Sequence, residues 1–246
     1  MKIDFSNKTV IVSGGTRGIG AALVKLFFNC NAQVIATGAH LEEIEKLNAQ
    51  SEDRVKYLHL DFTSNQSVKA CISNIIMLDQ IDVLINNAGV NKIDSIDKIE
   101  EDDWDWINNV NLRGPFLLTK AVSEIMKKKG QGKIVNISSI FGVVSKPKRA
   151  AYSTTKWGLI GFTKAVALDL APYNILVNAV SPGFVDTQLT RSILGEKGIK
   201  EITETIPQQR LATVEEIAKT VVYLASDHNT YITGQNIIVD GGFTSA

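Results

Sequence analysis

Tyr152 and Lys156, in the stretch AAYSTTKWG (150–158), have the types and the spacing of an acid/base pair. Side chains four residues apart lie on one face of a helix, so the phenol and the ammonium can reach the same volume of space. A nearby cation favours the phenolate and lowers the pKa of a tyrosine from its ordinary value of about 10. The pair is a candidate general acid/base, and a partly buried tyrosine beside a solvated lysine is the ordinary alternative.

The elements that must position this pair are predicted from hydrophobic periodicity. Short β-branched runs alternate with longer segments, such as GAALVKLFFNC (20–30), in which apolar residues recur at helical spacing. This alternation predicts one α/β domain over residues 1–246, a doubly wound parallel sheet of the Rossmann type with about seven strands and helices on both faces. The expected strands are 9–14, 33–38, 55–61, 81–87, 132–139, 174–181 and 235–242.

Small and polar residues follow four of these strands. In doubly wound sheets, ligands bind beyond the carboxyl ends of the strands, which all lie on one edge. Turn chemistry alone explains each cluster taken separately, but four clusters on the ligand-binding edge favour a site. The clusters are SGGTRGIG (13–20), NNAG (86–89), SS (138–139) and SPG (181–183).

The first cluster predicts a dinucleotide site. Gly14, Gly18 and Gly20 form a G-x-x-x-G-x-G pattern between a strand and a helix. Glycines there allow a tight turn and a close approach of the backbone to a pyrophosphate, and the N–H groups of the following helix suit an anion. A glycine-rich connection without a ligand is the alternative.

The end of the second strand indicates which dinucleotide is bound. NAD-binding proteins place a carboxylate near this position for the ribose hydroxyl, but ATGAH (36–40) contains no acid. Arg17, inside the glycine loop, could contact a phosphate on that ribose. The sequence therefore predicts NADP(H) in preference to NAD(H). The alternatives are that Arg17 caps a helix or forms a surface ion pair, or that Glu42 or Glu43 folds back to the ribose.

Together these motifs resemble the short-chain dehydrogenase/reductase family over essentially the whole chain. The resemblance includes Asn111 in NVNLRG, Ser139 in VNISS, YSTTK (152–156) and SPGFVDT (181–187). Within the family, the sequence is most similar to the 3-oxoacyl-carrier-protein reductases and to their sugar and polyol relatives. The implied activity is hydride transfer between a nicotinamide and a ketone or secondary alcohol, with a 3-oxoacyl thioester as the first candidate and a sugar or polyol as the alternative.

The resemblance also implies a catalytic tetrad. Tyr152 would donate a proton to the carbonyl oxygen as hydride arrives, and Lys156 would lower the pKa of the phenol and hold the nicotinamide ribose. Ser139 would hydrogen-bond the substrate oxygen, and Asn111, expected within a helix, would position a water that links Lys156 to solvent. The thirteen-residue gap to Tyr152 that is usual in the family selects Ser139 over Ser138.

Other positions match cofactor contacts of the family. Asp61 would reach the adenine, and Val185 and Thr187 the nicotinamide carboxamide and the pyrophosphate. The alternatives are a helix N-cap for Asp61 and turn chemistry for Asn87 and Gly89. The implied cofactor residues are Gly14, Thr16, Arg17, Gly18, Ile19, Gly20, Thr37, Asp61, Phe62, Asn87, Ala88, Gly89, Tyr152, Lys156, Pro182, Gly183, Val185 and Thr187.

Two segments bear on the substrate. Residues 188–210 resemble a mobile substrate lid, in which Gly195 and Gly198 would permit hinge motion. Carrier-protein reductases tend to present basic residues at two helix ends near the site entrance. The lysine run 127–129 matches the first of these, but Tyr173 stands where a cation is common in the second. Docking of an acyl carrier protein therefore remains open.

The bulk composition excludes several classes of function. Lysine plus arginine equals aspartate plus glutamate at 26 each, so no long-range field favours nucleic acid or a membrane surface. No apolar run approaches the roughly 20 residues of a membrane span, and the first ten residues lack the apolar core of a signal peptide. A cytoplasmic protein is expected. Cys30 and Cys71 are not arranged as metal ligands, so no metal site or disulfide is predicted.

The expected assembly is a homotetramer. The resemblance implies pairing through the helices that contain residues 101–129 and 150–170, with a second interface around the last strand. GLIGFTKAVALDL (158–170) has few charges for an exposed helix, which fits a buried interface. A dinucleotide-sensing regulator without catalysis and a structural protein are the alternatives from other classes, but neither needs all four tetrad residues.

Overall fold

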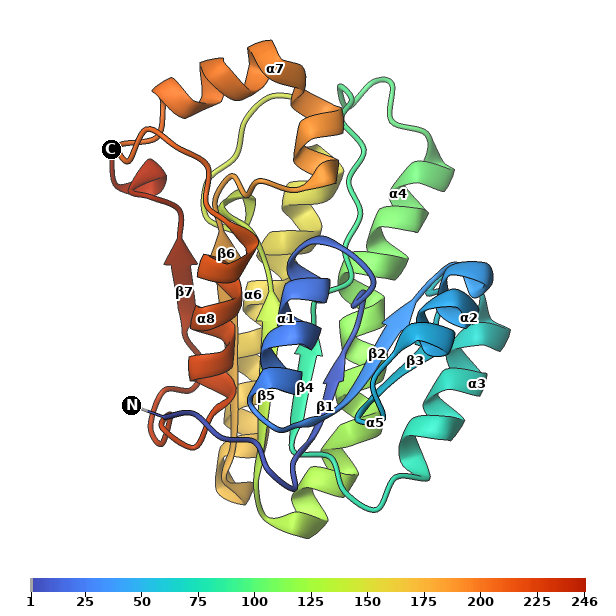
Figure 1. Cartoon of the computed structure of the whole chain (residues 1–246). Coiled ribbons are helices and arrows are strands. Elements are labelled where there is room, and N and C mark those ends of the chain that lie inside the picture. Colours follow the sequence, from blue (N-terminus) through green and yellow to red (C-terminus); the bar gives the residue numbers. More distant parts are fainter. Residues whose placement is uncertain (1) are drawn as a thin grey trace.

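Residues 2–246 are described by a computed structural model, in which a parallel sheet lies between two layers of helices (Figure 1). Apolar β-branched runs form its strands, and the helices between them follow the predicted alternation. The strands are β1 (Thr9–Val12), β2 (Gln33–Gly38), β3 (Val55–His59), β4 (Val83–Asn86), β5 (Gly132–Ile137), β6 (Ile175–Pro182) and β7 (Asn236–Val239). The α-helices are α1 (Gly18–Asn29), α2 (Leu41–Gln50), α3 (Asn65–Ile76), α4 (Glu101–Asn108), α5 (Gly114–Lys129), α6 (Ala150–Leu170), α7 (Gln188–Glu204) and α8 (Val214–Ala225).

The strand order is β3-β2-β1-β4-β5-β6-β7, and every pairing is parallel. The chain moves outward in one direction from β1 to β3 and in the other from β4 to β7. The crevice between β1 and β4 is the topological switch point, where doubly wound sheets bind their ligands. The predicted fold is confirmed, and each expected strand overlaps the strand observed.

Two hydrophobic cores flank the sheet because successive side chains of a strand point to opposite faces. In β1, Val10 and Val12 pack with residues of α1 and α8, whereas Ile11 packs on the other face with residues of α3, α5 and α6. All three side chains are fully buried. Burial on both faces explains why the strands are continuous apolar runs. Each layer of helices thus packs on one face of the sheet and holds the strands in place.

The helical segment expected over 101–129 consists of three parts. A π-helical turn, Asn109–Arg113, joins α4 to α5, and Pro115 lies in the first turn of α5. Wide turns of this kind are frequent at functional sites, and this one contains Asn111. The helix was predicted correctly, but its periodicity gave no sign of the π turn.

The expected lid coincides with α7, which lies beyond the carboxyl ends of the strands (Figure 1). The helix is interrupted at Gly195, whose φ of 63° and ψ of 178° are not helical. Only glycine adopts such a conformation readily, because it has no Cβ. Gly198, the other expected hinge residue, has helical geometry. Hinge motion at either glycine remains a prediction.

Cys30 and Cys71 are free, and burial raises the pKa of the Cys71 thiol to about 11. Neither thiol is therefore activated as a nucleophile. Within residues 2–246, no helix combines the length and the apolar character that crossing a bilayer requires. The same residues contain no group of three or more histidine, cysteine or acidic side chains arranged to hold a metal ion.

Candidate active site

The glycine loop turns from β1 into α1 directly above the end of β4. Gly14 has a φ of 64°, and a Cβ there would lie 2.8 Å from the Cα of Ala88. A Cβ on Gly20 would overlap the carbonyl oxygen of Gly14. The N-cap residue of α1, Arg17, makes no side-chain capping bond within the described residues 2–246. The loop therefore needs glycine for its fold and leaves the first helical N–H groups for an anion, as a dinucleotide requires.

Hydrogen bonds join this loop to the NNAG segment. Ser13 Oγ accepts from the backbone N–H groups of Asn87 and Ala88 at 3.0 and 3.1 Å. The Asn87 Nδ2 donates to the carbonyl oxygens of Ser13 and Gly14 at 3.0 and 2.9 Å. The Asn87 side chain thus braces the loop, which agrees with the turn-chemistry alternative for that side chain. Ser13 was not among the predicted site residues, although its position at the end of β1 could have suggested it.

Arg17 is exposed at the N-cap of α1, and within residues 2–246 its side chain makes neither a capping bond nor an ion pair. The capping and ion-pair alternatives for Arg17 are therefore wrong. Glu42 and Glu43 lie in the first turn of α2 and form no ion pair with Arg17. Thr37 is buried, and its Oγ1 accepts from the N–H of Gly14 at 3.4 Å, so its side chain supports the loop from below.

Asp61 and Phe62 follow β3. The Asp61 carboxylate accepts from the N–H and the hydroxyl of Thr63 at 2.9 and 2.7 Å, whereas Ser64 is the N-cap of α3. The N-cap alternative for Asp61 is therefore wrong, because its carboxylate closes a turn one step earlier. Phe62 is buried in the core on the α3 side and packs against Gly114. The Phe62 side chain thus fixes the strand end that carries Asp61.

The segment after β6 returns to the glycine loop. A Cβ on Gly18 would lie 3.6 Å from Thr187 Cγ2, so the two loops face each other. Thr187 caps α7 by accepting from the N–H of Thr190 at 3.1 Å. Val185 is buried and forms an isolated parallel bridge with Ala212. Of the other predicted cofactor residues, Ile19 lies in the first turn of α1 and Thr16 packs against Gly38. Pro182 ends β6, and Gly183 follows it beside Asp240.

Tyr152 and Lys156 occupy the first two turns of α6, as their spacing predicted. Lys156 is 3% exposed, and its Nζ donates to the carbonyl oxygen of Ile137 at 2.8 Å. The same Nζ lies 5.6 Å from the centroid of the Tyr152 ring. Burial lowers the pKa of the Lys156 ammonium to about 8. A lysine held this way has a charge that is sensitive to its surroundings near neutral pH.

Burial raises the pKa of the Tyr152 phenol, and it outweighs a hydrogen bond with Ser139 and the positive charge of Arg149, which both lower it. The groups that lower the pKa of the Tyr152 phenol in this structure are Ser139 and Arg149. That Lys156, whose ammonium lies 5.6 Å from the ring centroid, also lowers it stays a prediction. Tyr152 is thus protonated at neutral pH, as a proton donor must be.

The two neighbouring serines have different partners. Ser138 Oγ donates to the carbonyl oxygen of Lys156 at 3.0 Å and is buried behind α6. Ser139 Oγ accepts from the N–H of Phe141 at 3.1 Å and is close enough to the Tyr152 phenol to lower its pKa. Ser139, the serine selected by the family spacing, is therefore the one beside the phenol.

Asn111 lies behind this group, in the π-helical turn. Its Oδ1 accepts from the N–H of Val90 at 2.8 Å, and its Nδ2 donates to the Val90 carbonyl at 2.9 Å and to Thr155 Oγ1 at 3.2 Å. A Cβ on Gly89 would lie 3.5 Å from Lys156 Nζ and 3.6 Å from Asn111 Oδ1. The fold therefore brings the four predicted tetrad residues together from the π turn, the end of β5 and α6.

A buried polar ladder beneath the tetrad was not predicted. Asn86 and Asn136 are paired neighbours in β4 and β5, and Asn86 Nδ2 donates to Asn136 Oδ1 at 2.8 Å. Asn136 Nδ2 donates in turn to Thr163 Oγ1 of α6 at 2.9 Å. Buried polar groups of this kind fix one arrangement of the elements that they join. The available signal was an asparagine inside each of two otherwise apolar strands.

An aromatic wall beside Tyr152 also escaped prediction. Phe141 contacts Tyr152 and Phe184 edge to face, with ring centroids 6.4 and 6.1 Å apart, and Phe184 contacts Phe243 at 5.4 Å. These rings come from segments far apart in the sequence, so no local pattern predicts that they form a cluster. Of the three rings, Phe141 is the one that contacts the Tyr152 ring directly.

The lysine run 127–129 lies at the other end of the sheet. Lys129 Nζ is 2.6 Å from Asp82, which precedes β4, and Lys127 lies over the Tyr173 ring at 4.8 Å. The expectation that this run flanks the site entrance is therefore wrong for the site within the same chain. The reason is that α5 runs antiparallel to the strands, so its last turn reaches their amino ends (Figure 1).

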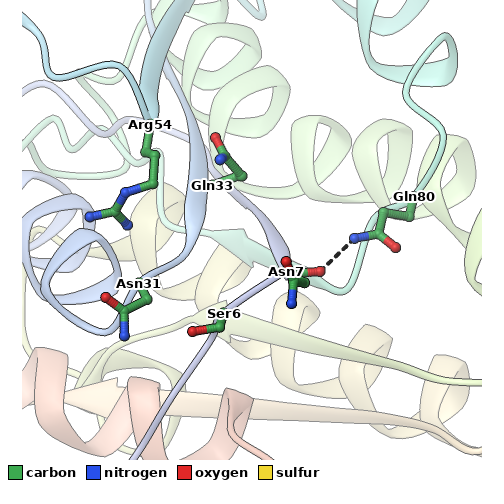
Figure 2. Close-up of a pocket in the computed structure, with 6 residues that line it drawn as sticks. All are labelled: Ser6, Asn7, Asn31, Gln33, Arg54 and Gln80. Carbon is green, nitrogen blue, oxygen red and sulfur yellow. Dashed lines mark hydrogen bonds between the residues drawn. The ribbon is translucent and has the colours of Figure 1, made fainter.

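A surface recess is present at the same amino ends (Figure 2), lined by Ser6, Asn7, Asn31, Gln33, Arg54 and Gln80. Arg54 Nη1 donates to the carbonyl oxygens of Phe28 and Ala32, both at 3.1 Å. Gln80 Nε2 donates to the carbonyl of Asn7. These hydrogen bonds connect the loops at the amino ends of the strands to one another. The recess lies far from Tyr152 and has none of the acid/base groups that the other edge brings together.

The family described as "Enoyl-(Acyl carrier protein) reductase" matches residues 14–244. The chain is 38% identical over 239 residues to the 3-oxoacyl-[acyl-carrier-protein] reductase FabG of Thermotoga maritima, which covers 96% of this chain and 97% of that protein. These matches show that the chain belongs to the short-chain dehydrogenase/reductase family and is an oxidoreductase.

Solved structures of this family have the same fold. The gluconate 5-dehydrogenase of Burkholderia cenocepacia, in complex with NADP and tartrate, matches with a TM-score of 0.93 and 30% identity, covering 100% of this chain and 98% of that one. ElxO with NADP bound matches with a TM-score of 0.90 and 32% identity, covering 97% of this chain and 99% of that one. Both matches extend over the edge that carries Tyr152.

Proposed function

We propose that this protein is a cytoplasmic, NADP(H)-dependent enzyme that transfers a hydride between the nicotinamide and a ketone or secondary alcohol. The observation that carries this proposal is the contact of a protonated phenol, Tyr152, with Ser139 and with the buried ammonium of Lys156. The group lies at the carboxyl edge of the sheet, beside the switch point between β1 and β4, because a Cβ on Gly89 after β4 would lie 3.5 Å from Lys156 Nζ. A regulator without catalysis has no use for such a buried set of proton-transfer groups.

In the direction of reduction, Tyr152 supplies the proton. Its Oη donates to the substrate oxygen as negative charge develops there, and Ser139 donates a second hydrogen bond to the same oxygen. The bound nicotinamide supplies the hydride. Transfer of the proton leaves a phenolate, which the neighbouring Lys156 ammonium stabilises, and the same ammonium would hold the nicotinamide ribose. Asn111, fixed by Val90 and Thr155, shapes the path by which water reaches Lys156.

The cofactor is held by the glycine loop and the loops facing it. Gly14 and Gly20 allow the tight fold of the loop, because a Cβ on either would collide with Ala88 or with the carbonyl of Gly14, and this fold presents the N-terminus of α1 to a pyrophosphate. The exposed Arg17 forms neither a capping bond nor an ion pair within residues 2–246, so its guanidinium can bind a ribose phosphate. NADP in the structures of the gluconate 5-dehydrogenase and of ElxO supports this preference.

Two substrate classes follow from the relatives. A 3-oxoacyl thioester is supported by the carrier-protein reductases at 38% identity. A sugar acid or polyol is supported by the structural match to gluconate 5-dehydrogenase. The distant position of the lysine run weakens carrier docking at the site of the same chain.

A homotetramer is part of the proposal. Phe116 of α5 and Trp157 and Leu168 of α6 are large apolar side chains that lie exposed on the proposed pairing helices. Phe116 lines an apolar groove between α5 and α6, together with Phe162. Ile238 of β7, the edge strand, is also exposed. Patches of this kind mark interfaces, and light scattering at micromolar concentration that gives a monomer would contradict the assembly.

A screen of the purified protein with NADPH and NADH tests the activity. We expect at least one ketone to oxidise NADPH. The values of kcat/KM are compared for a carrier-bound 3-oxoacyl substrate, its truncated thioester and keto sugar acids. A gain from the carrier that falls with salt supports docking. Tight NADPH binding without turnover of any ketone or alcohol would favour the regulator instead.

A further inference from the structure

Arg149 is a buried cation without a partner. The residue is 6% exposed and precedes the first residue of α6. Its Nε and Nη1 are buried and have no hydrogen-bond partner, and within residues 2–246 it forms no ion pair. Buried polar groups are almost always hydrogen-bonded, and buried charges are almost always paired. Residues 2–246 provide no acceptor for these two nitrogens. A bound ligand could provide one.

The arginine lies against the site. Its guanidinium is 5.5 Å from the Phe141 ring, and its charge acts on the Tyr152 phenol. A second cation, Lys146, lies 5.7 Å from the ring centroids of both Phe141 and Phe184. Two positive charges thus lie on the aromatic wall that borders the phenol, and no carboxylate in residues 2–246 pairs with either.

The loop that carries these cations is fixed in place. Ser145 Oγ and Ser153 Oγ are hydrogen-bonded at 2.9 Å, which ties the loop to α6. Lys148, between the two cations, has a φ of 66°, a conformation that the surrounding structure must impose. Pro147 further limits the loop. The cations are therefore positioned before any ligand arrives, which lowers the entropic cost of binding.

We propose that Arg149, assisted by Lys146, binds a carboxylate of the substrate, so that the enzyme acts on a keto acid or a hydroxy acid. This inference rests on the proposed function and selects among its substrates. A guanidinium matches a carboxylate through parallel hydrogen bonds, and the ring of Phe141 supports its face. The carboxylate has to lie only a few bonds from the reacting carbon, because Arg149 and Tyr152 are neighbours.

The geometry disfavours the other anion among the candidate substrates. The phosphate of a carrier prosthetic group is separated from the ketone by a long chain, so it cannot reach a group beside Tyr152. A neutral polyol would leave both buried nitrogens of Arg149 without an acceptor, which costs affinity. A carboxylate close to the carbonyl both reaches Arg149 and provides an acceptor for its buried nitrogens.

Matched pairs of substrates test the proposal. We compare kcat/KM with NADPH for acetoacetate against acetoacetamide, and for 5-ketogluconate against fructose. In the wild type, the acid is expected to be preferred in each pair. Arg149→Gln should lower the ratio of acid to neutral substrate by about ten- to a hundred-fold, the value of one charge-assisted hydrogen bond. Arg149→Lys should fall between the two, and Lys148→Gln, which removes an exposed charge from the same loop, should keep the wild-type ratio.

Two results would overturn the carboxylate site. One is an unchanged ratio in Arg149→Gln. The other is an equal loss on acid and neutral substrates, which would mean that Arg149 acts through the pKa of Tyr152. If Arg149→Gln does not fold by circular dichroism, the ratio in Arg149→Lys decides in its place, because that variant keeps the charge and loses the planar geometry.

A binding measurement separates this inference from the proposed function. Calorimetry of the NADP-saturated wild type should detect millimolar or tighter binding of tartrate and weaker binding of threitol, its uncharged counterpart. Arg149→Gln should abolish the difference. No preference for tartrate in the wild type, or a preference retained in Arg149→Gln, contradicts the anion site even if ketones are reduced. Failure of every ketone with tartrate binding intact contradicts only the proposed activity.

Discussion

Arg54 and Arg149 lie at opposite ends of the sheet, and both stack on a phenylalanine. The Arg54 guanidinium is 4.3 Å from the Phe28 ring and donates to the carbonyls of Phe28 and Ala32. The Arg149 guanidinium is 5.5 Å from the Phe141 ring, and two of its buried nitrogens have no acceptor. Both guanidinium groups lie over a phenylalanine ring, but only that of Arg54 has hydrogen-bond acceptors within residues 2–246.

This difference extends to the two edges as a whole. At the amino edge, Gln80 donates to Asn7 (Figure 2), and the Asp82 carboxylate accepts from Lys129 and from the N–H of Thr9. At the carboxyl edge, the glycine loop keeps an uncapped helix N-terminus, and Lys156 is buried with a lowered pKa. Polar groups at one edge stabilise the fold, whereas those at the other remain available to a ligand. The following changes should separate these two roles.

Tyr152→Phe should have the largest effect. Loss of the proton donor should lower kcat by about a hundred- to ten-thousand-fold, the usual contribution of a general acid. NADPH affinity, measured by fluorescence titration, should change little, because the phenol acts in the transition state. Tyr231→Phe, at a residue that is 94% exposed, is the control. Full turnover in Tyr152→Phe would remove the phenol from the mechanism.

Lys156 should make stability depend on pH. Burial lowers its pKa from 10.5 to about 8. The unfolded chain therefore binds more protons between these values, and the contribution of Lys156 to the free energy of unfolding should rise with pH across that window. The full change is on the order of 3 kcal/mol. It should be absent in Lys156→Met, and denaturant titrations at pH 7.5 and pH 10 measure it. If the free energies of unfolding of the wild type and of Lys156→Met differed by the same amount at both pH values, the lowered pKa of Lys156 would be contradicted.

Arg17→Ala should reduce the preference for NADPH over NADH by about ten- to a hundred-fold, because a charge-assisted hydrogen bond to phosphate is lost. The dissociation constants of both cofactors provide the measurement. Lys25→Ala, an exposed cation farther along α1, should leave the ratio unchanged. Equal affinity of the wild type for the two cofactors would show that Arg17 does not recognise the phosphate.

Arg54→Ala should act on stability alone. Removal of the guanidinium leaves the carbonyls of Phe28 and Ala32 without this donor and should lower the free energy of unfolding by about 1–3 kcal/mol. Urea denaturation measures this change, and kcat/KM at saturating NADPH should match that of the wild type. Lys56→Ala, at an exposed residue of β3, is the control. A loss of activity without a loss of stability would give the amino edge a role in function.

Much of the fold and part of the site could be predicted from local patterns. Unbroken apolar runs identify strands that are buried on both faces, and Gly14 and Gly20 occupy positions that no larger residue fits. Tyr152 and Lys156 share a helix, so their spacing alone places them together. These features depend on neighbours in the chain, which the sequence displays directly.

The features that escaped prediction depend on packing between distant segments. The π turn at Asn111 and the unpaired state of Arg149 are visible only once the partners of each side chain are known. The error on the lysine run 127–129 is of another kind. Helices in a parallel sheet run opposite to the strands, so the last turn of α5 has to lie at the amino edge, and that reasoning was available from the sequence.

Hydrogen–deuterium exchange with and without NADPH tests most directly whether the ligand occupies the carboxyl edge. Binding should slow exchange in the segments 14–20, 87–90 and 183–188, which carry the glycine loop and the loops facing it. The segments around Ser6, Arg54 and Gln80, at the amino edge, should exchange at the same rate in both samples. Protection confined to the amino edge, with no change in the glycine loop, would contradict the assignment of the two edges.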